Sequence, residues 1–260
     1  MSSLLNILQP ERHHIKLEIA GIELTVRPYN HGDTKAFLEL LSDYKAKKKG
    51  GEKKLLLAQE ELINACIIPD ETGRKPIKAR DLHRADFVAL MVFLKNITHG
   101  EESHIRFQCS NKKCENPETK NPYITTIPFV FDDAVIKGER KEKISFDYMG
   151  KEVTIFTKPY TLGTMIQNAE LFDIDIPDME VIHKFQASFV DYLSVGDEVY
   201  EDIPFKDKVE FLTKLTPKYK KFLVSYIEEE PIYIWEKEWK CPICEAINIA
   251  IFDKVQDFFV

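Results

Sequence analysis

Four of the five cysteines fall into two close pairs that could bind a metal ion. Cys109 and Cys114 are separated by four residues, and Cys241 and Cys244 by two. Each pair follows a segment of alternating polar and apolar residues that is typical of a β-strand. A short turn brings two sulfurs together, and two such turns supply the four thiolates of a tetrahedral zinc site. We therefore expect one structural Zn²⁺ shared by all four cysteines.

Other uses of the cysteines are less consistent with this pattern. A catalytic zinc ion keeps one position open for water and usually has histidine or carboxylate ligands, whereas four thiolates close the coordination shell. An iron–sulfur cluster also takes four cysteines and is the alternative cofactor. The fifth cysteine, Cys66, lies in the apolar segment 62–68 and is expected to be a buried core thiol.

Composition excludes several classes of protein. The chain has 260 residues, of which 44% are hydrophobic, enough for one large or two small domains. The net charge of −7 argues against nucleic acid as the main partner. No apolar run approaches the roughly 18 residues that span a membrane. Residues 1–14 lack the features of a secretory signal, which together with reduced cysteines favours assembly in a cytoplasm.

Two parts of the chain share one pattern. Residues 15–29 and 144–160 each show alternating apolar residues, a glycine turn, a second alternating run and then a basic residue followed by Pro-Tyr. This pattern predicts a β-hairpin in each part. The equivalent residues lie at nearly constant separations: 129 residues from Gly21 to Gly150, 131 from Pro28 to Pro159 and 132 from Cys109 to Cys241. We interpret this as an internal duplication.

Each half should therefore contain a hairpin, helices, a strand, a cysteine pair and a second strand. Apolar periodicity predicts helices near 32–48, 52–67, 79–97, 161–171, 179–193 and 205–228. It predicts strands at 105–108, 125–131, 235–240 and 247–252. The expected fold is α+β, with two pseudo-equivalent lobes joined at the shared zinc site. The expected divisions are an N-terminal arm at 1–14, a first lobe at 15–135 and a second lobe at 143–260.

The chain carries no recognisable catalytic motif, and its ends are suited to protein contacts. Scattered histidines and carboxylates form no pattern of a nucleophile, general base or phosphate-binding loop, so no small-molecule substrate is expected. Apolar residues at a chain end pack either on their own domain or on a neighbouring subunit. The candidate partner-binding residues are Leu4, Leu5, Ile7, Leu8, Phe258, Phe259 and Val260.

Several short motifs resemble the baseplate hub proteins of T-even-type contractile-tailed phages. They are Arg27-Pro28-Tyr29, Thr98-His99-Gly100-Glu101, the Cys109 and Cys114 pair, and Asp257-Phe258-Phe259. The first cysteine pair has four intervening residues where the family pattern has two. The resemblance implies a virion protein of the tail baseplate hub, with other hub or tail subunits as partners and no enzymatic activity.

Two alternatives remain open. The chain could be an assembly chaperone or initiator that acts on hub or tape-measure proteins and leaves before the virion is complete. It could also be a zinc-ribbon protein that binds nucleic acid, which the basic run at 45–54 favours and the overall acidic charge disfavours.

Overall fold

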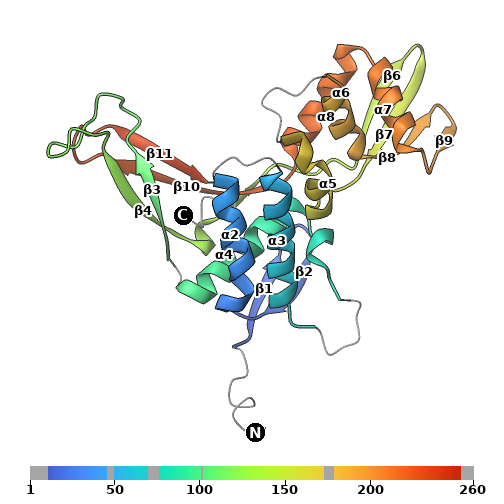
Figure 1. Ribbon diagram of the computed structural model, residues 1–260. Coiled ribbons are helices and arrows are strands. Elements are labelled where there is room, and N and C mark those ends of the chain that lie inside the picture. The colour runs from blue at the N-terminus through green and yellow to red at the C-terminus, as the bar shows by residue number, and fades with distance from the viewer. Residues whose placement is uncertain (1–10, 46–49, 70–75, 101, 173–178, 253–260) are drawn as a thin grey trace, which may run out of the picture.

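The computed structural model describes residues 11–45, 50–69, 76–100, 102–172 and 179–252. The structure contains both helices and antiparallel sheets, so the predicted α+β class is confirmed. Figure 1 shows a central group of helices, an arm of two long hairpins on one side, and a second group of helices and strands on the other.

The central group begins with the predicted first hairpin. Strands β1 (His13–Leu17) and β2 (Ile22–Val26) pair antiparallel across a turn at Gly21, whose φ of 63° favours glycine. The helical elements that follow are α2 (His31–Lys45), α3 (Gly51–Cys66), the 3-10 helix η1 (Ala79–Asp81) and α4 (Arg84–His99). The buried Asp86 carboxylate accepts the backbone N–H groups of Ile19 and Ala20 at 3.2 and 2.8 Å. Helix α4 thereby holds the hairpin turn against the central core.

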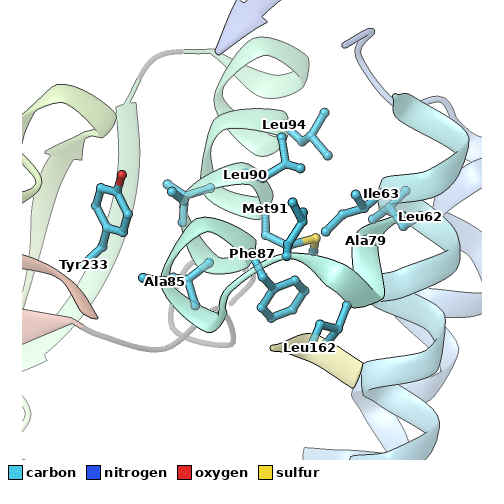
Figure 2. Close-up of a cluster of buried hydrophobic side chains, with 14 of the residues drawn as sticks. Leu62, Ile63, Ala79, Ala85, Phe87, Leu90, Met91, Leu94, Leu162 and Tyr233 are labelled. Carbon is cyan, nitrogen blue, oxygen red and sulfur yellow. The ribbon is translucent and has the colours of Figure 1, made fainter. Parts of the chain in front are cut away.

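Helix α4 is the centre of the first hydrophobic core. Its buried stripe has the i, i+3, i+4, i+7 spacing that the sequence predicts: Phe87, Leu90, Met91 and Leu94. Figure 2 shows these side chains facing Leu62 and Ile63 of α3. Leu162 of α5 (Leu162–Phe172) and Tyr233 of β10 (Ile232–Lys240) belong to the same cluster. Segments from distant parts of the chain therefore complete this core.

The arm consists of two antiparallel hairpins. One joins β3 (Glu102–Gln108) to β4 (Ile124–Val130), and the other joins β10 to β11 (Ile247–Phe252). All four strands are predicted from the sequence. After the short 3-10 helix η2 (Phe131–Asp133), strand β5 (Val135–Lys137), which was not predicted, pairs with the first three residues of β10, whereas β11 pairs with the rest of that strand. The strand order is β11-β10-β5.

The second group contains a four-stranded antiparallel sheet of order β6-β7-β8-β9. Its strands are β6 (Lys143–Tyr148), β7 (Lys151–Thr157), β8 (Val190–Val195) and β9 (Glu198–Tyr200). The first two form the predicted second hairpin. Helices α5, α6 (Met179–Ser188), α7 (Phe205–Lys214) and α8 (Pro217–Glu229) accompany the sheet. Buried residues between Ile144 and Tyr226 make a second core cluster.

Three predicted helix boundaries are wrong. The helix expected at 179–193 ends at Ser188, because Val190–Val195 alternates and reverses at Gly196, whose φ is 59°. The helix expected at 205–228 is divided, since Pro217 cannot donate an internal hydrogen bond and instead occupies the first turn of α8. The helix expected from residue 79 begins at Arg84, after η1.

The C-terminal hairpin packs with the first half of the chain. Its inward-facing residues Tyr233, Trp235, Ala250 and Phe252 belong to the same buried cluster as α3 and α4. The second cluster contains residues 144–226 and none from this hairpin. One hydrophobic core therefore contains residues from both of the expected lobes, 15–135 and 143–260. The division into these lobes stays a prediction.

A buried polar network joins the two groups of helices. His83 caps α4 by accepting the Ala85 N–H through Nδ1 at 3.1 Å, so the ring proton lies on Nε2. Nε2 then donates to Glu230 Oε2 at 2.6 Å, with both side chains at most 5% exposed. The Tyr226 hydroxyl donates to the other carboxylate oxygen at 2.7 Å. The end of α8 is thereby tied to the start of α4.

Removing the carboxylate of this network should destabilise the fold. In Glu230→Ala, the His83 N–H and the Tyr226 hydroxyl lose their buried acceptor, and the free energy of unfolding should fall by about 3 kcal/mol. Glu229→Ala is the matched control, because Glu229 lies on the surface beside Lys141 and should change stability by less than about 1 kcal/mol. Equilibrium urea unfolding measures both changes, and equal effects would contradict a structural role for the network.

Candidate metal centre

The first cysteine pair lies in the loop that joins β3 to β4. Cys109 follows the last residue of β3, and its N–H donates to the Tyr123 carbonyl at 2.9 Å. The Cys114 N–H donates to the Asn111 carbonyl at 2.8 Å, which closes a tight turn between the two cysteines. The longer polar insert after Cys114 returns to Tyr123, whose N–H donates to the Cys114 carbonyl at 3.1 Å. The backbone therefore positions both sulfurs.

The second pair lies in the turn between β10 and β11. The Cys241 N–H donates to the Ala246 carbonyl, and the Glu245 N–H donates to the Cys241 carbonyl, both at 2.9 Å. Glu245 has a φ of 59°, a left-handed conformation that lets the chain reverse just after Cys244. This is the more compact of the two turns, consistent with its shorter cysteine spacing.

The two turns meet at the far end of the arm (Figure 1), and all four sulfurs lie within 4.8 Å of one another. The Cys109 and Cys244 sulfurs are 3.6 Å apart, as are those of Cys114 and Cys241. A tetrahedral ion with metal–sulfur bonds of about 2.3 Å requires sulfur separations of about 3.8 Å. The cysteines are free thiols rather than disulfides. The geometry therefore fits a four-thiolate metal site.

The surroundings of the sulfurs also suit a cation. Cys109, Cys114 and Cys241 are at most 4% exposed, and Cys244 is half-buried. Burial raises the pKa of the Cys109 and Cys114 thiols, because a lone thiolate is poorly solvated there. The Ala246 backbone N–H lowers the pKa of Cys244 to about 7. Four adjacent thiolates would repel one another unless a cation neutralised them, so this donor set fits a thiophilic divalent ion.

Contacts between the hairpins hold the two turns in register. The buried Asn248 side chain accepts the Ser110 N–H through Oδ1 at 2.7 Å and donates to the Ala246 carbonyl at 2.9 Å. Phe252 packs edge-on against Phe107 and Phe129, with ring centroids 4.7 and 4.4 Å apart. These contacts join the hairpins independently of any metal ion.

The sequence identified the cysteines but not the residues that support them. Asn248 and Phe252 showed only the alternation of a strand, and nothing local indicates that they face the other hairpin. Cys66 is fully buried, as predicted. The candidate partner-binding residues of both chain ends, Leu4, Leu5, Ile7, Leu8, Phe258, Phe259 and Val260, lie outside the described residues. Among the helices that the structure describes, none is both long and apolar enough to cross a membrane.

Loss of the Asn248 amide should weaken the junction of the two turns. In Asn248→Ala, the Ser110 N–H and the Ala246 carbonyl lose a buried partner, and stability should fall by about 2 kcal/mol. Asn121→Ala is the matched control, because Asn121 is an exposed amide in the neighbouring insert. Thermal unfolding followed by circular dichroism compares the two, and an unchanged midpoint for Asn248→Ala would contradict this assignment.

Comparison with known proteins places the chain in a structural family. No curated protein and no solved structure matches it. The model of one protein family, described as T4 bacteriophage base plate protein, matches residues 10–260 and so includes both hairpins of the arm and all four cysteines. This chain therefore belongs to the T4 bacteriophage base plate protein family.

Proposed function

We propose that this chain is a structural subunit of a phage tail baseplate hub that contacts other hub or tail subunits during assembly and in the virion. The observation that carries the proposal is the family match across residues 10–260. The assignment to the hub rests on the motif resemblance in the sequence, and the partner identity follows from that assignment.

Two of the motifs behind the hub assignment contact one another in the described part of the chain, which suits a scaffold. The Arg27 guanidinium donates to both carboxylate oxygens of Asp33 at 2.8 and 3.1 Å. The Tyr29 N–H donates to the Thr98 hydroxyl at 3.2 Å, and its ring packs edge-on against His99. The Arg-Pro-Tyr and Thr-His-Gly motifs thus brace one another beside the central core.

The proposed role of the metal ion is also structural. Within the described residues, the four cysteines are the one group of three or more potential ligands close enough to hold a metal. They would hold one Zn²⁺ in a closed shell and leave no coordination position for a substrate. We therefore propose no catalytic activity. The ion would instead fasten the β10–β11 turn to the β3–β4 turn, across 127 residues of intervening chain.

We further propose that the chain arose by internal duplication into two lobes, 15–135 and 143–260, preceded by an N-terminal arm at 1–14. Support comes from the order of elements. Each half has a hairpin, then helices, then a hairpin that carries a cysteine pair at its turn. The extra hairpin β8–β9 belongs to the second half alone and would be a later insertion.

Metal analysis tests the zinc assignment. Purified protein should contain one zinc ion per chain, and a chelator should lower the thermal unfolding midpoint because the bound ion stabilises only the folded state. Cys114→Ser should lose the ion, whereas Cys66→Ala, the control thiol in the core, should retain it. A coloured protein that contains iron would point to an iron–sulfur cluster, and zero or two ions per chain would contradict a shared site.

Mass spectrometry of purified tails tests the baseplate role. A structural subunit should be present in intact particles at a constant ratio to other baseplate proteins. A mutant phage that carries Cys114→Ser should yield fewer complete tails, while Cys66→Ala should assemble normally. Presence during assembly but absence from finished tails would instead identify an assembly chaperone. Salt-dependent binding to DNA would favour the nucleic-acid alternative.

A further inference from the structure

Strand β11 exposes a row of isoleucines on the outer face of the arm. Ile247, Ile249 and Ile251 are 66%, 57% and 54% exposed. The residues between them, Asn248 and Ala250, are buried against the other hairpin. Three large β-branched side chains in succession on one face of a strand make an apolar surface that water solvates poorly.

The same strand has an open edge. Among the described residues, β11 pairs with β10 alone. The Cys241 N–H donates to the Ala246 carbonyl, which makes these two residues a hydrogen-bonded pair. Because hydrogen-bonded and non-hydrogen-bonded pairs alternate in an antiparallel ladder, the N–H and C=O groups of the three isoleucines point away from β10. The exposed side chains and the backbone groups that have no partner strand in the described part of the chain therefore belong to the same residues.

Such an edge is a template for another strand. Strand β9, at the edge of the four-stranded sheet, has only three residues. Strand β11 has six residues, all paired with β10 without a bulge, and so presents a longer edge to a partner strand. A strand added to β11 would satisfy the open backbone groups and place its own side chains beside the isoleucines.

We propose that β11 pairs antiparallel with β11 of a second copy of this chain, around a twofold axis that passes beside Ile249. Isoleucines lie two residues before and two residues after Ile249, so the row of exposed isoleucines is the same in both directions along the strand. Ile249 then faces its own counterpart, and Ile247 of each copy faces Ile251 of the other. Three isoleucine pairs form one apolar surface, and the two three-stranded sheets become a continuous sheet.

The charges beside this strand are compatible with the twofold pairing. On the outer face of β10, Lys240 lies opposite Ile247, Glu238 opposite Ile249 and Glu236 opposite Ile251. The axis places Lys240 of one copy and Glu236 of the other in the same cross-strand row, with opposite signs. The Lys240–Glu236 pairs and the two Glu238 side chains are each three strand spacings apart, about 14 Å, which exceeds the screening length of about 8 Å in physiological salt, so these charges neither oppose nor drive the pairing strongly.

The pairing goes beyond the proposed baseplate role and does not rest on it. Light scattering during size-exclusion chromatography of the full-length, metal-loaded protein should give twice the chain mass of 30.2 kDa. Ile249→Lys places two ammonium groups opposite one another at the axis and removes the central cross-strand pair of isoleucines. It should raise the dimer dissociation constant on the order of 100-fold.

Val199→Lys is the matched control. Val199 is 58% exposed on β9, so the same substitution adds the same charge to an edge strand of the four-stranded sheet. This variant should dimerise like the natural chain. Ile249→Thr, which keeps a β-branched side chain, should weaken the dimer less than Ile249→Lys. Circular dichroism and metal content, unchanged in all three variants, exclude unfolding as the cause.

Three results would overturn the proposal. One is a monomer at every attainable concentration of the full-length protein. Another is a dimer that Ile249→Lys leaves intact. The third is a dimer that forms only after residues 253–260 are removed, since the edge would then be occupied by the chain's own C-terminal segment.

Discussion

The docking of the C-terminal hairpin onto the β3–β4 hairpin is the contact on which the rest of the structure depends. It brings Cys241 within 3.6 Å of Cys114, although 127 residues separate them. Closing a chain loop of that length costs on the order of 4 kcal/mol in conformational entropy. The aromatic contacts of Phe252 and the amide of Asn248 offset part of this cost, and a bound metal ion would offset more. All residues between the two hairpins must therefore fold so that the C-terminal hairpin reaches the β3–β4 hairpin.

Buried polar side chains make further connections between distant segments, in addition to the apolar core. Asp86 holds a hairpin turn, Glu230 joins α8 to α4, and Lys208 donates to the carbonyls of Val190 and Asp191 at 2.9 and 2.8 Å. Burial lowers the pKa of Lys208, whose ammonium is nevertheless satisfied by these carbonyls. A polar group in such a position tolerates one arrangement of its neighbours, whereas apolar contacts tolerate several. These groups therefore give the structure a defined geometry.

An arm whose two hairpins were fastened by the proposed metal ion would suit a baseplate subunit, because a surface whose geometry is fixed before binding loses less conformational entropy when a partner binds. The inner face of the arm is occupied by its own aromatic core, and its outer face presents isoleucines and an open strand edge. The two features of the arm thus have separate roles. The cysteines would hold the two hairpins together, and the exposed outer face leaves a surface available for contact with a partner.

The sequence by itself determined the elements whose signals are local. Both hairpins, the stripe of α4 and the two cysteine turns follow from alternation, helical periodicity and turn residues within short segments. Where two local signals competed, as at Val190–Val195 after α6, the strand formed because β7 provides a pairing partner that periodicity cannot reveal. Only the tertiary structure decided that Tyr233 and Phe252 complete the core around α4, and that Asn248 joins the two cysteine turns. These outcomes depend on which distant segments meet, and that depends on the packing of the whole chain.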